Sequence, residues 1–269
     1  MDNKQIALYY LALPLEKGSE LITVNLYLEA YYTLRNSTSL INVMEAYFLL
    51  GQYDKVHQYS DKSISLALEE GNTLALASTY KLIGDVYAAL NIEELMTPLY
   101  QRTINLLQNT NWSEQLEMIY YNMGATLISS KKYALALEYL NKVSWQESFL
   151  LDHKKALALI RSGEIDSSLA ILNRMQQWVQ KEASSGIDVK VEELMLQEAL
   201  YECQRNFLQS HEYLNLLEKL MEELKKHRHR GFLLFYKNIA KETYCIHRKY
   251  KKALELDDLI SYKDEKTPF

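Results

Sequence analysis

Three segments of the chain align without gaps and begin 40 residues apart: LINVMEAYFLLGQYDKVHQYSDKSI at 40–64, YKLIGDVYAALNIEELMTPLYQRTI at 80–104 and YYNMGATLISSKKYALALEYLNKVS at 120–144. Each segment reads as two helices joined by a tight turn. In the first, Leu40, Val43, Tyr47 and Leu50 recur at the spacing of a helix face, and a second apolar series follows the turn. Self-similarity at a fixed period indicates stacked helix pairs that share a continuous core.

The residue at each turn supports this interpretation. Gly and Asn tolerate the left-handed backbone conformation that ends a helix, whereas Lys131 tolerates it less well, so a different turn is expected there. Three similar turns follow the aligned segments, and together they predict about six helix pairs within residues 38–262. The six predicted turn positions are Gly51, Asn91, Lys131, Gly163, Arg205 and Arg248.

The third segment resembles the tetratricopeptide repeat (TPR) family most fully. It has a large residue, a small residue four positions on, a large apolar residue three after that, an aromatic at the turn and Ala three further on: Tyr120, Gly124, Leu127, Tyr133 and Ala136. The resemblance implies an all-α fold, a TPR-like helix-turn-helix solenoid (α-α superhelix).

The small residue has a physical role, because it lets the second helix of a pair approach the first. Three repeats depart from the pattern, with Met44, Glu198 and Lys241 at this position. The repeats are also longer than the roughly 34 residues typical of the family.

The two ends of the chain do not fit the repeat. Residues 1–37 are expected to form an N-terminal helical cap, with a first helix ended by Pro14 and a second over 18–34. A solenoid needs such a cap because its terminal apolar face would otherwise meet water. The polar residues 263–269 are expected to form a disordered tail.

Composition narrows the possible functions. The net charge is −5, which disfavours direct nucleic-acid binding, since phosphate contacts need clustered Lys and Arg. No apolar stretch reaches the length of about 18 residues that predicts a membrane span. The two cysteines, Cys203 and Cys245, are too few for a disulfide framework, which favours a reduced cytoplasmic setting, and both are expected to be buried.

No catalytic motif, metal-ligand spacing or cofactor-binding motif is present, so the chain is predicted to be neither an enzyme nor a holder of a cofactor or metal. The basic run 225–230 is expected to be the solvated C-terminal end of a helix, where the helix dipole favours cations. The run 247–252 is interpreted as a turn and a solvated helix start.

The TPR resemblance implies a ligand site on the concave side, which the first helix of each pair lines. In TPR domains, Asn side chains of these helices often clamp a peptide backbone, and Asn42 and Asn122 occupy matching positions, with Asn238 one position earlier in the last repeat. These amides could instead complete polar contacts between neighbouring helices. The same alignment places seven further residues on the concave side: Glu45, Lys81, Asp85, Tyr121, His153, Lys154 and Arg161.

The long, irregular repeats and the Tyr- and Leu-rich helices are similar to the repeat domains of bacterial peptide-pheromone receptors of the Rap/Rgg/PlcR group. Those proteins bind a short peptide in the concave groove, and most carry a DNA-binding helix-turn-helix domain for which residues 1–37 are too short. The resemblance implies a peptide- or protein-binding repeat module, as the ligand-sensing part of a peptide-responsive transcription regulator. The alternative is a constitutive protein-protein interaction scaffold without a peptide ligand, for example as a homodimer.

Overall fold

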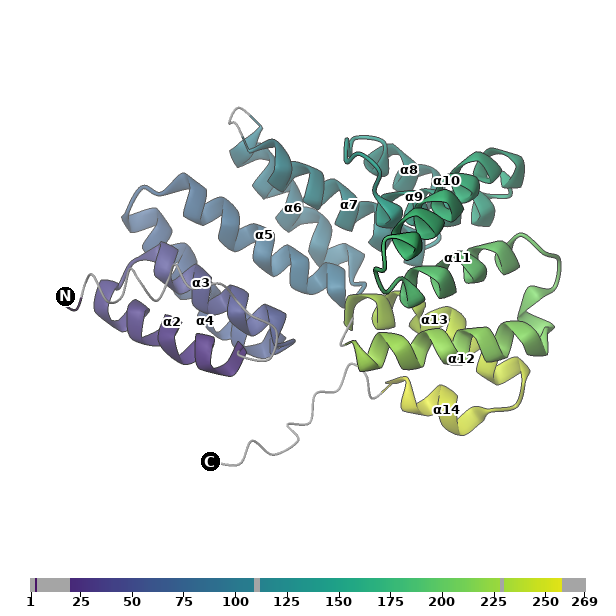
Figure 1. Ribbon diagram of the computed structural model, residues 1–269. Coiled ribbons are helices and arrows are strands. Elements are labelled where there is room, and N and C mark those ends of the chain that lie inside the picture. The colour runs from purple at the N-terminus through teal and green to yellow at the C-terminus, as the bar shows by residue number, and fades with distance from the viewer. Residues whose placement is uncertain (1–2, 4–19, 109–111, 228–229, 258–269) are drawn as a thin grey trace. The chain divides into compact units, whose positions relative to one another are not determined.

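The computed structural model describes Asn3 and residues 20–108, 112–227 and 230–257. Within these residues the chain forms 13 α-helices and one 3-10 turn, and no strand (Figure 1). The elements are α2 (Glu20–Leu34), α3 (Ser37–Leu49), α4 (Tyr53–Glu69), α5 (Thr73–Ala89), α6 (Glu93–Leu107), α7 (Ser113–Ser129), α8 (Tyr133–Leu140), α9 (Phe149–Ser162), α10 (Ile165–Ser184), α11 (Lys190–Glu202), η1 (Phe207–Gln209), α12 (His211–Lys226), α13 (Arg230–Ile246) and α14 (Tyr250–Glu255).

From α3 onward the helices form six consecutive pairs, α3–α4 to α13–α14, each joined by a short turn. This confirms the predicted all-α fold built from TPR-like helix-turn-helix pairs. None of the helices in the described ranges is long and apolar enough to cross a membrane.

The pairs belong to two compact units, a division that the repeat pattern does not predict. Unit 1 comprises Met1–Ala88 and Glu94–Leu116, and unit 2 comprises Ala89–Glu93 and Glu117–Phe269. In unit 1, α2 packs on α3 through buried residues that include Val24, Tyr27 and Leu40. The helix expected over 18–34 is therefore present from Glu20 and covers the first pair, whereas the helix expected before Pro14 lies outside the described residues.

The turns follow the sequence prediction with two differences. Gly51, Asn91, Gly163 and Arg248 have left-handed backbone angles, as expected, and Lys131 adopts the same conformation at φ 60°, so its turn matches the others.

The fifth turn is one residue later than predicted, because Asn206 rather than Arg205 has the positive φ, at 59°. Asn visits this conformation more readily than Arg, since its short side chain can hydrogen-bond locally. The corrected turn also moves the small-residue position from Glu198 to the fully buried Ala199, so this repeat has a small residue there as well.

The small residues do allow close helix approach. A Cβ added at Gly84 on α5 would lie 2.6 Å from the ring of Tyr100 on α6. One added at Gly124 on α7 would lie 2.5 Å from Leu140 on α8. In the first repeat the sizes are reversed: Met44 is fully buried, and the position that matches Tyr100 and Leu140 holds Ser60.

The prediction for the cysteines was wrong. Cys245 is exposed and Cys203 is only half-buried, because each lies in the last residues of its repeat's first helix or just past it. Helix ends near a turn leave one side of the chain open to solvent.

We expect Gly84→Ala to destabilise the protein by about 1–3 kcal/mol, because the added methyl group overlaps the Tyr100 ring and forces the α5–α6 pair apart. Urea unfolding followed by circular dichroism measures the change. Gly231→Ala on α13 is the matched control, since a Cβ there meets no atom within 4 Å, and helix propensity alone makes it neutral or stabilising by up to about 1 kcal/mol. Equal effects of the two substitutions would contradict the close-approach explanation.

Candidate functional site

Three of the residues predicted to line the concave side come together in unit 1. Glu45 lies on α3, and Lys81 and Asp85 lie one helical turn apart on α5. Lys81 Nζ is 2.6 Å from Asp85 Oδ2, and the hydroxyl of Tyr100 donates a hydrogen bond to Asp85 Oδ1 at 2.5 Å. The Tyr100 ring that packs against Gly84 therefore also fixes the carboxylate next to it.

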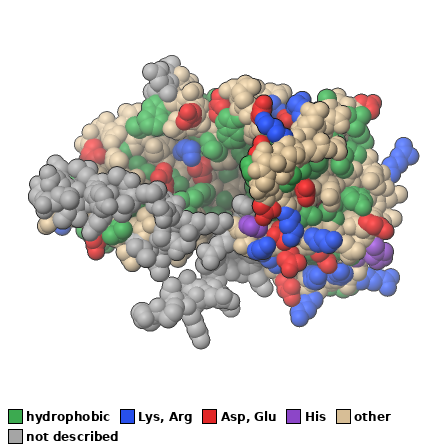
Figure 2. Space-filling view, in the orientation of Figure 1, with side chains coloured by type: hydrophobic (Ala, Val, Ile, Leu, Met, Phe, Trp, Pro, Cys, Tyr) green, Lys and Arg blue, Asp and Glu red, His purple; other side chains and the backbone are tan. Residues whose placement is uncertain are grey.

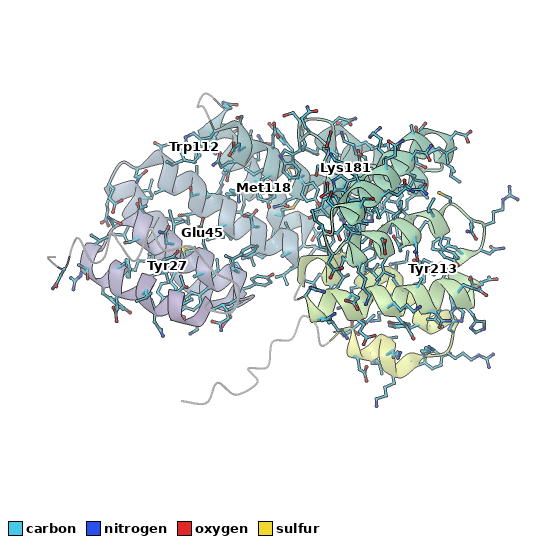
Figure 3. The ribbon with its side chains drawn as sticks, in the orientation of Figure 1. Tyr27, Glu45, Trp112, Met118, Lys181 and Tyr213 are labelled. Atoms are coloured by element: carbon cyan, nitrogen blue, oxygen red, sulfur yellow. The ribbon has the colours of Figure 1, made fainter. Side chains whose placement is uncertain are left out.

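Glu45 and Asp85 occupy the same position in successive repeats, which explains why stacking of the pairs brings them together. The Glu45 side chain reaches solvent, and the protein atoms around it desolvate its carboxylate in part. This desolvation raises the pKa of Glu45, and the Asp85 carboxylate raises it further while Lys81 opposes the shift. Figure 3 labels Glu45 beside Tyr27 of α2, a buried phenol whose pKa is raised by burial and by the Glu45 charge.

A second polar cluster lies in unit 2 on α9, α11 and α13, the first helices of three consecutive pairs. Arg161 of α9 forms two hydrogen bonds with the carboxylate of Glu202 on α11, at 2.8 and 2.5 Å. Burial alone would raise the pKa of Glu202, but the charge and hydrogen bonds of Arg161 outweigh it and hold the pKa below its ordinary value.

Glu198, one turn before Glu202, is fully buried and has the opposite shift. Burial raises the pKa of Glu198 well above its ordinary value, and the neighbouring Glu202 carboxylate raises it further. The hydroxyls of Tyr213 and Tyr236 donate to the two Glu198 oxygens at 3.2 and 3.4 Å. A protonated Glu198 bound by two tyrosines is consistent with this setting.

His153 and Lys154, two other predicted contacts on α9, are also buried, with exposed fractions of 0% and 2%. His153 Nε2 is 2.9 Å from the Tyr236 hydroxyl, and Nδ1 has no hydrogen-bond partner. Lys154 Nζ has no hydrogen-bond partner either and lies 3.0 Å from the centroid of the Phe235 ring. Burial lowers the pKa of Lys154 well below its ordinary value, and the Arg161 charge lowers it further.

In unit 2 the inner face of these three helices is thus filled by the protein's own side chains. Phe235 and Tyr236 of α13 reach α9, and an external ligand would have to displace them to touch His153 or Lys154. The sequence did not indicate that Glu198, Glu202 and the two aromatic residues contact side chains of α9. Their helices, α11 and α13, are distant from α9 in the sequence.

The remaining predicted contacts lie nearer the surface. Asn42 on α3 and Asn122 on α7 are partly exposed, and Asn238 on α13 is exposed. The ring of Tyr121 on α7 packs at a tilt against Trp145, at 5.1 Å between ring centroids, and burial raises the pKa of Tyr121.

Two lysines of the basic run 247–252 form ion pairs within unit 2. Lys249 and Lys252 both contact Glu218 Oε1, at 2.7 and 2.9 Å. Figure 2 shows acidic and basic side chains interspersed over this part of unit 2. The run 225–230 begins as predicted, with Lys225 and Lys226 in the last turn of α12. Across the described ranges, no three His, Cys, Asp or Glu side chains are grouped so as to hold a metal ion.

We expect Lys154→Met to stabilise the protein by about 1 kcal/mol or more, because an apolar side chain of similar length replaces a buried amine without a partner. At pH values between the lowered pKa of Lys154 in the folded protein and the ordinary pKa of a lysine, the unfolded chain binds a proton that the folded protein does not. The stability of the unsubstituted protein therefore rises with pH through this window, and the advantage of the variant is greatest at its acidic end. Urea unfolding at several pH values measures both effects.

The exposed Lys219 on α12 provides the control, and Lys219→Met is expected to leave the pH dependence unchanged. A destabilised Lys154→Met variant would show that the ammonium has a stabilising partner.

Arg161→Met is expected to destabilise the protein by about 3–5 kcal/mol, because it leaves the buried carboxylate of Glu202 without its cation. Thermal unfolding measures the loss. A change below about 1 kcal/mol would indicate that water reaches Glu202 and compensates the missing charge.

Comparisons with known proteins do not assign a family. No protein-family model matches the chain, and no curated protein matches it. A solved structure with similarity to the chain is the TPR2AB-domain:pHSP90 complex of yeast Sti1, at a TM-score of 0.34 and 13% sequence identity, over 96% of both chains. A similarity at that TM-score does not support a fold assignment, so the assignment depends on the helix pairs themselves.

Proposed function

We propose that this protein is a binding module that takes up a peptide or an extended protein segment along the first helices of its repeats. The observation that carries the proposal is the cluster of Glu45, Lys81 and Asp85 on α3 and α5. These are polar side chains on successive first helices, and Glu45 combines access to solvent with a protein-lined environment.

The exposed stripe of α3 has the chemistry that an extended segment needs. Asn42, Glu45 and Leu49 lie three and four residues apart, so they share one helix face. Asn42 offers an amide that can donate to and accept from a peptide backbone, and Leu49 is a large apolar side chain with 60% of its surface exposed. A ligand could therefore be held by hydrogen bonds and by apolar contact together.

The charges at this site favour a ligand with a basic side chain. Lys81 already pairs with Asp85, whereas Glu45 makes no ion pair or hydrogen bond with any residue in the described ranges. An ionised and partly desolvated Glu45 gains more from a Lys or Arg of the ligand than an ordinary surface carboxylate does.

A narrower form of the proposal makes the chain the ligand-sensing part of a peptide-responsive transcription regulator. It depends on the resemblance in repeat length and helix composition, to which the described geometry adds nothing. The rival form is a constitutive scaffold that holds a folded partner, and it would bind no linear peptide.

A phage-displayed random peptide library tests the proposal. Selection on the protein is expected to enrich peptides with a basic residue, and Glu45→Gln is expected to weaken their binding by about tenfold, the loss typical of one charged contact. The exposed Glu69 on the second helix α4 gives the matched control, and Glu69→Gln should leave the affinity unchanged. Isothermal titration with the enriched peptides measures the affinities. Failure to enrich any peptide, or equal affinities for both variants, would count against the proposed site.

The same peptides should bind more weakly as the pH falls through the pKa of Glu45, because protonation removes the charge that the ligand contacts. Since the pKa of Glu45 is raised, this loss should begin at a higher pH than for an ordinary glutamate. Titrations over a pH series measure it, and the Glu45→Gln variant should show no such loss. The same decline in that variant would assign it to another group.

A further inference from the structure

A cavity of about 590 Å³ opens in unit 2 between the link that joins α8 to α9, the start of α9, and α10. It does not involve the α3–α5 site, and the sequence patterns did not predict it. Its walls contain two of the three tryptophans of the chain, Trp145 and Trp178, together with Phe149 and Met175. The rest of the lining is mostly polar and includes five charged side chains, so the cavity combines aromatic rings with charged groups.

The aromatic side chains are held in place by one another. The Trp178 ring lies 5.2 Å from the ring of Phe149, and the Trp145 ring lies 5.1 Å from that of Tyr121, both pairs being tilted. Both tryptophans remain partly exposed, so their rings keep apolar surface that a ligand could cover. Flat rings held in this way would favour a flat aromatic ligand, since stacked and tilted aromatic pairs gain energy beyond simple burial.

The charged groups at the cavity do not balance. Arg174 forms two hydrogen bonds with Asp152, at 3.1 and 2.7 Å, and Lys181, labelled in Figure 3, pairs with Glu147 at 2.9 Å. Lys155 is the third cation that lines the cavity.

The ammonium of Lys155 makes no ion pair or hydrogen bond with any other residue for which the structure gives a position. Partial burial lowers the pKa of Lys155, and the Arg174 charge adds to this while Asp152 opposes it. One positive charge is therefore left over beside an aromatic wall. The first turn of α9, whose N-terminal end carries a partial positive charge, also lines the cavity.

We propose that this cavity binds a small aromatic carboxylate, with its ring against Trp145 and Trp178 and its carboxylate at the Lys155 ammonium. A neutral aromatic molecule would leave Lys155 without a partner, and an aliphatic acid would lose the ring contacts. The proposed ligand has both an aromatic ring and a carboxylate. It could be a free acid or the C-terminal aromatic residue of a peptide.

The test uses N-acetyl-L-phenylalanine and its amide as probes. Tryptophan fluorescence reports binding, and a Trp112→Phe background confines the signal to Trp145 and Trp178. The acid is expected to bind saturably, about tenfold more tightly than the amide, and more tightly than hexanoate. No saturable binding, equal binding of acid and amide, or equal binding of hexanoate would each overturn the proposal.

Lys155→Met tests the assigned cation and preserves the apolar stem of the side chain. It is expected to remove the preference for the acid over the amide while ring binding persists, whereas Lys219→Met on α12 should keep that preference. Thermal unfolding checks that both variants are folded. An unchanged preference in a folded Lys155→Met variant would overturn the role of Lys155.

A short peptide that ends in phenylalanine distinguishes the two sources of the carboxylate. If the peptide binds more tightly than N-acetyl-L-phenylalanine, the proposal is supported and the natural ligand is the C-terminal end of a peptide chain. If the peptide binds equally or more weakly, the proposal is supported and the natural ligand is a free acid.

Discussion

The close approach of the two helices in a pair is the constraint on which this structure depends. At Gly84 and Gly124 the missing side chain leaves room for Tyr100 and Leu140 of the partner helix. In the first pair the large residue is Met44 on the first helix and the small one is Ser60 on the second. Each of these three pairs thus combines one large and one small side chain, and interiors packed at this density tolerate little change in either.

The same constraint positions the chemistry in unit 1. The Tyr100 ring packs on Gly84, and its hydroxyl then holds Asp85, which in turn holds Lys81. Because Glu45 occupies the matching position one repeat earlier, the regular stacking brings it to this pair without any further device. The polar site is therefore a consequence of helix packing, because Asp85 directly follows Gly84, where the two helices approach most closely.

The first helices of unit 2 use similar residue types for a different purpose. Glu198 and Glu202 are buried beside the partly exposed Arg161, and the aromatic side chains of α13 close over His153 and Lys154. Buried ionic groups of this kind add little net stability compared with apolar packing, but removal of one partner is costly. In unit 2 the charges of α9 and α11 are therefore internal contacts, whereas Glu45 in unit 1 can still meet a ligand.

The sequence predicted the features that depend on local pattern. The repeat of 40 residues located the first three helix pairs, similar turns located the other three, and five of the six turns fell at the predicted residue. The fifth turn was misplaced by one residue because the short η1 helix follows it and interrupts the spacing that the other repeats share.

The features that depend on contacts between distant segments could not be predicted. The helix positions of His153 and Lys154 suggested a concave surface, but only the packing of α13 shows that both side chains are covered. The cavity near Trp145 and Trp178 was missed for a related reason. The link before α9 has no periodic pattern, and the pairing of its charges with those of α10 is visible only in three dimensions.

Hydrogen–deuterium exchange, measured with and without a peptide selected on the protein, tests the central claim most directly. Bound segments slow the local opening that amide exchange requires, so the protected helices identify the binding surface. If the ligand lies where we propose, exchange slows in α3 and α5 and is unchanged in α9, α11 and α13. Protection confined to α9, α11 and α13, or absent everywhere, would contradict the account.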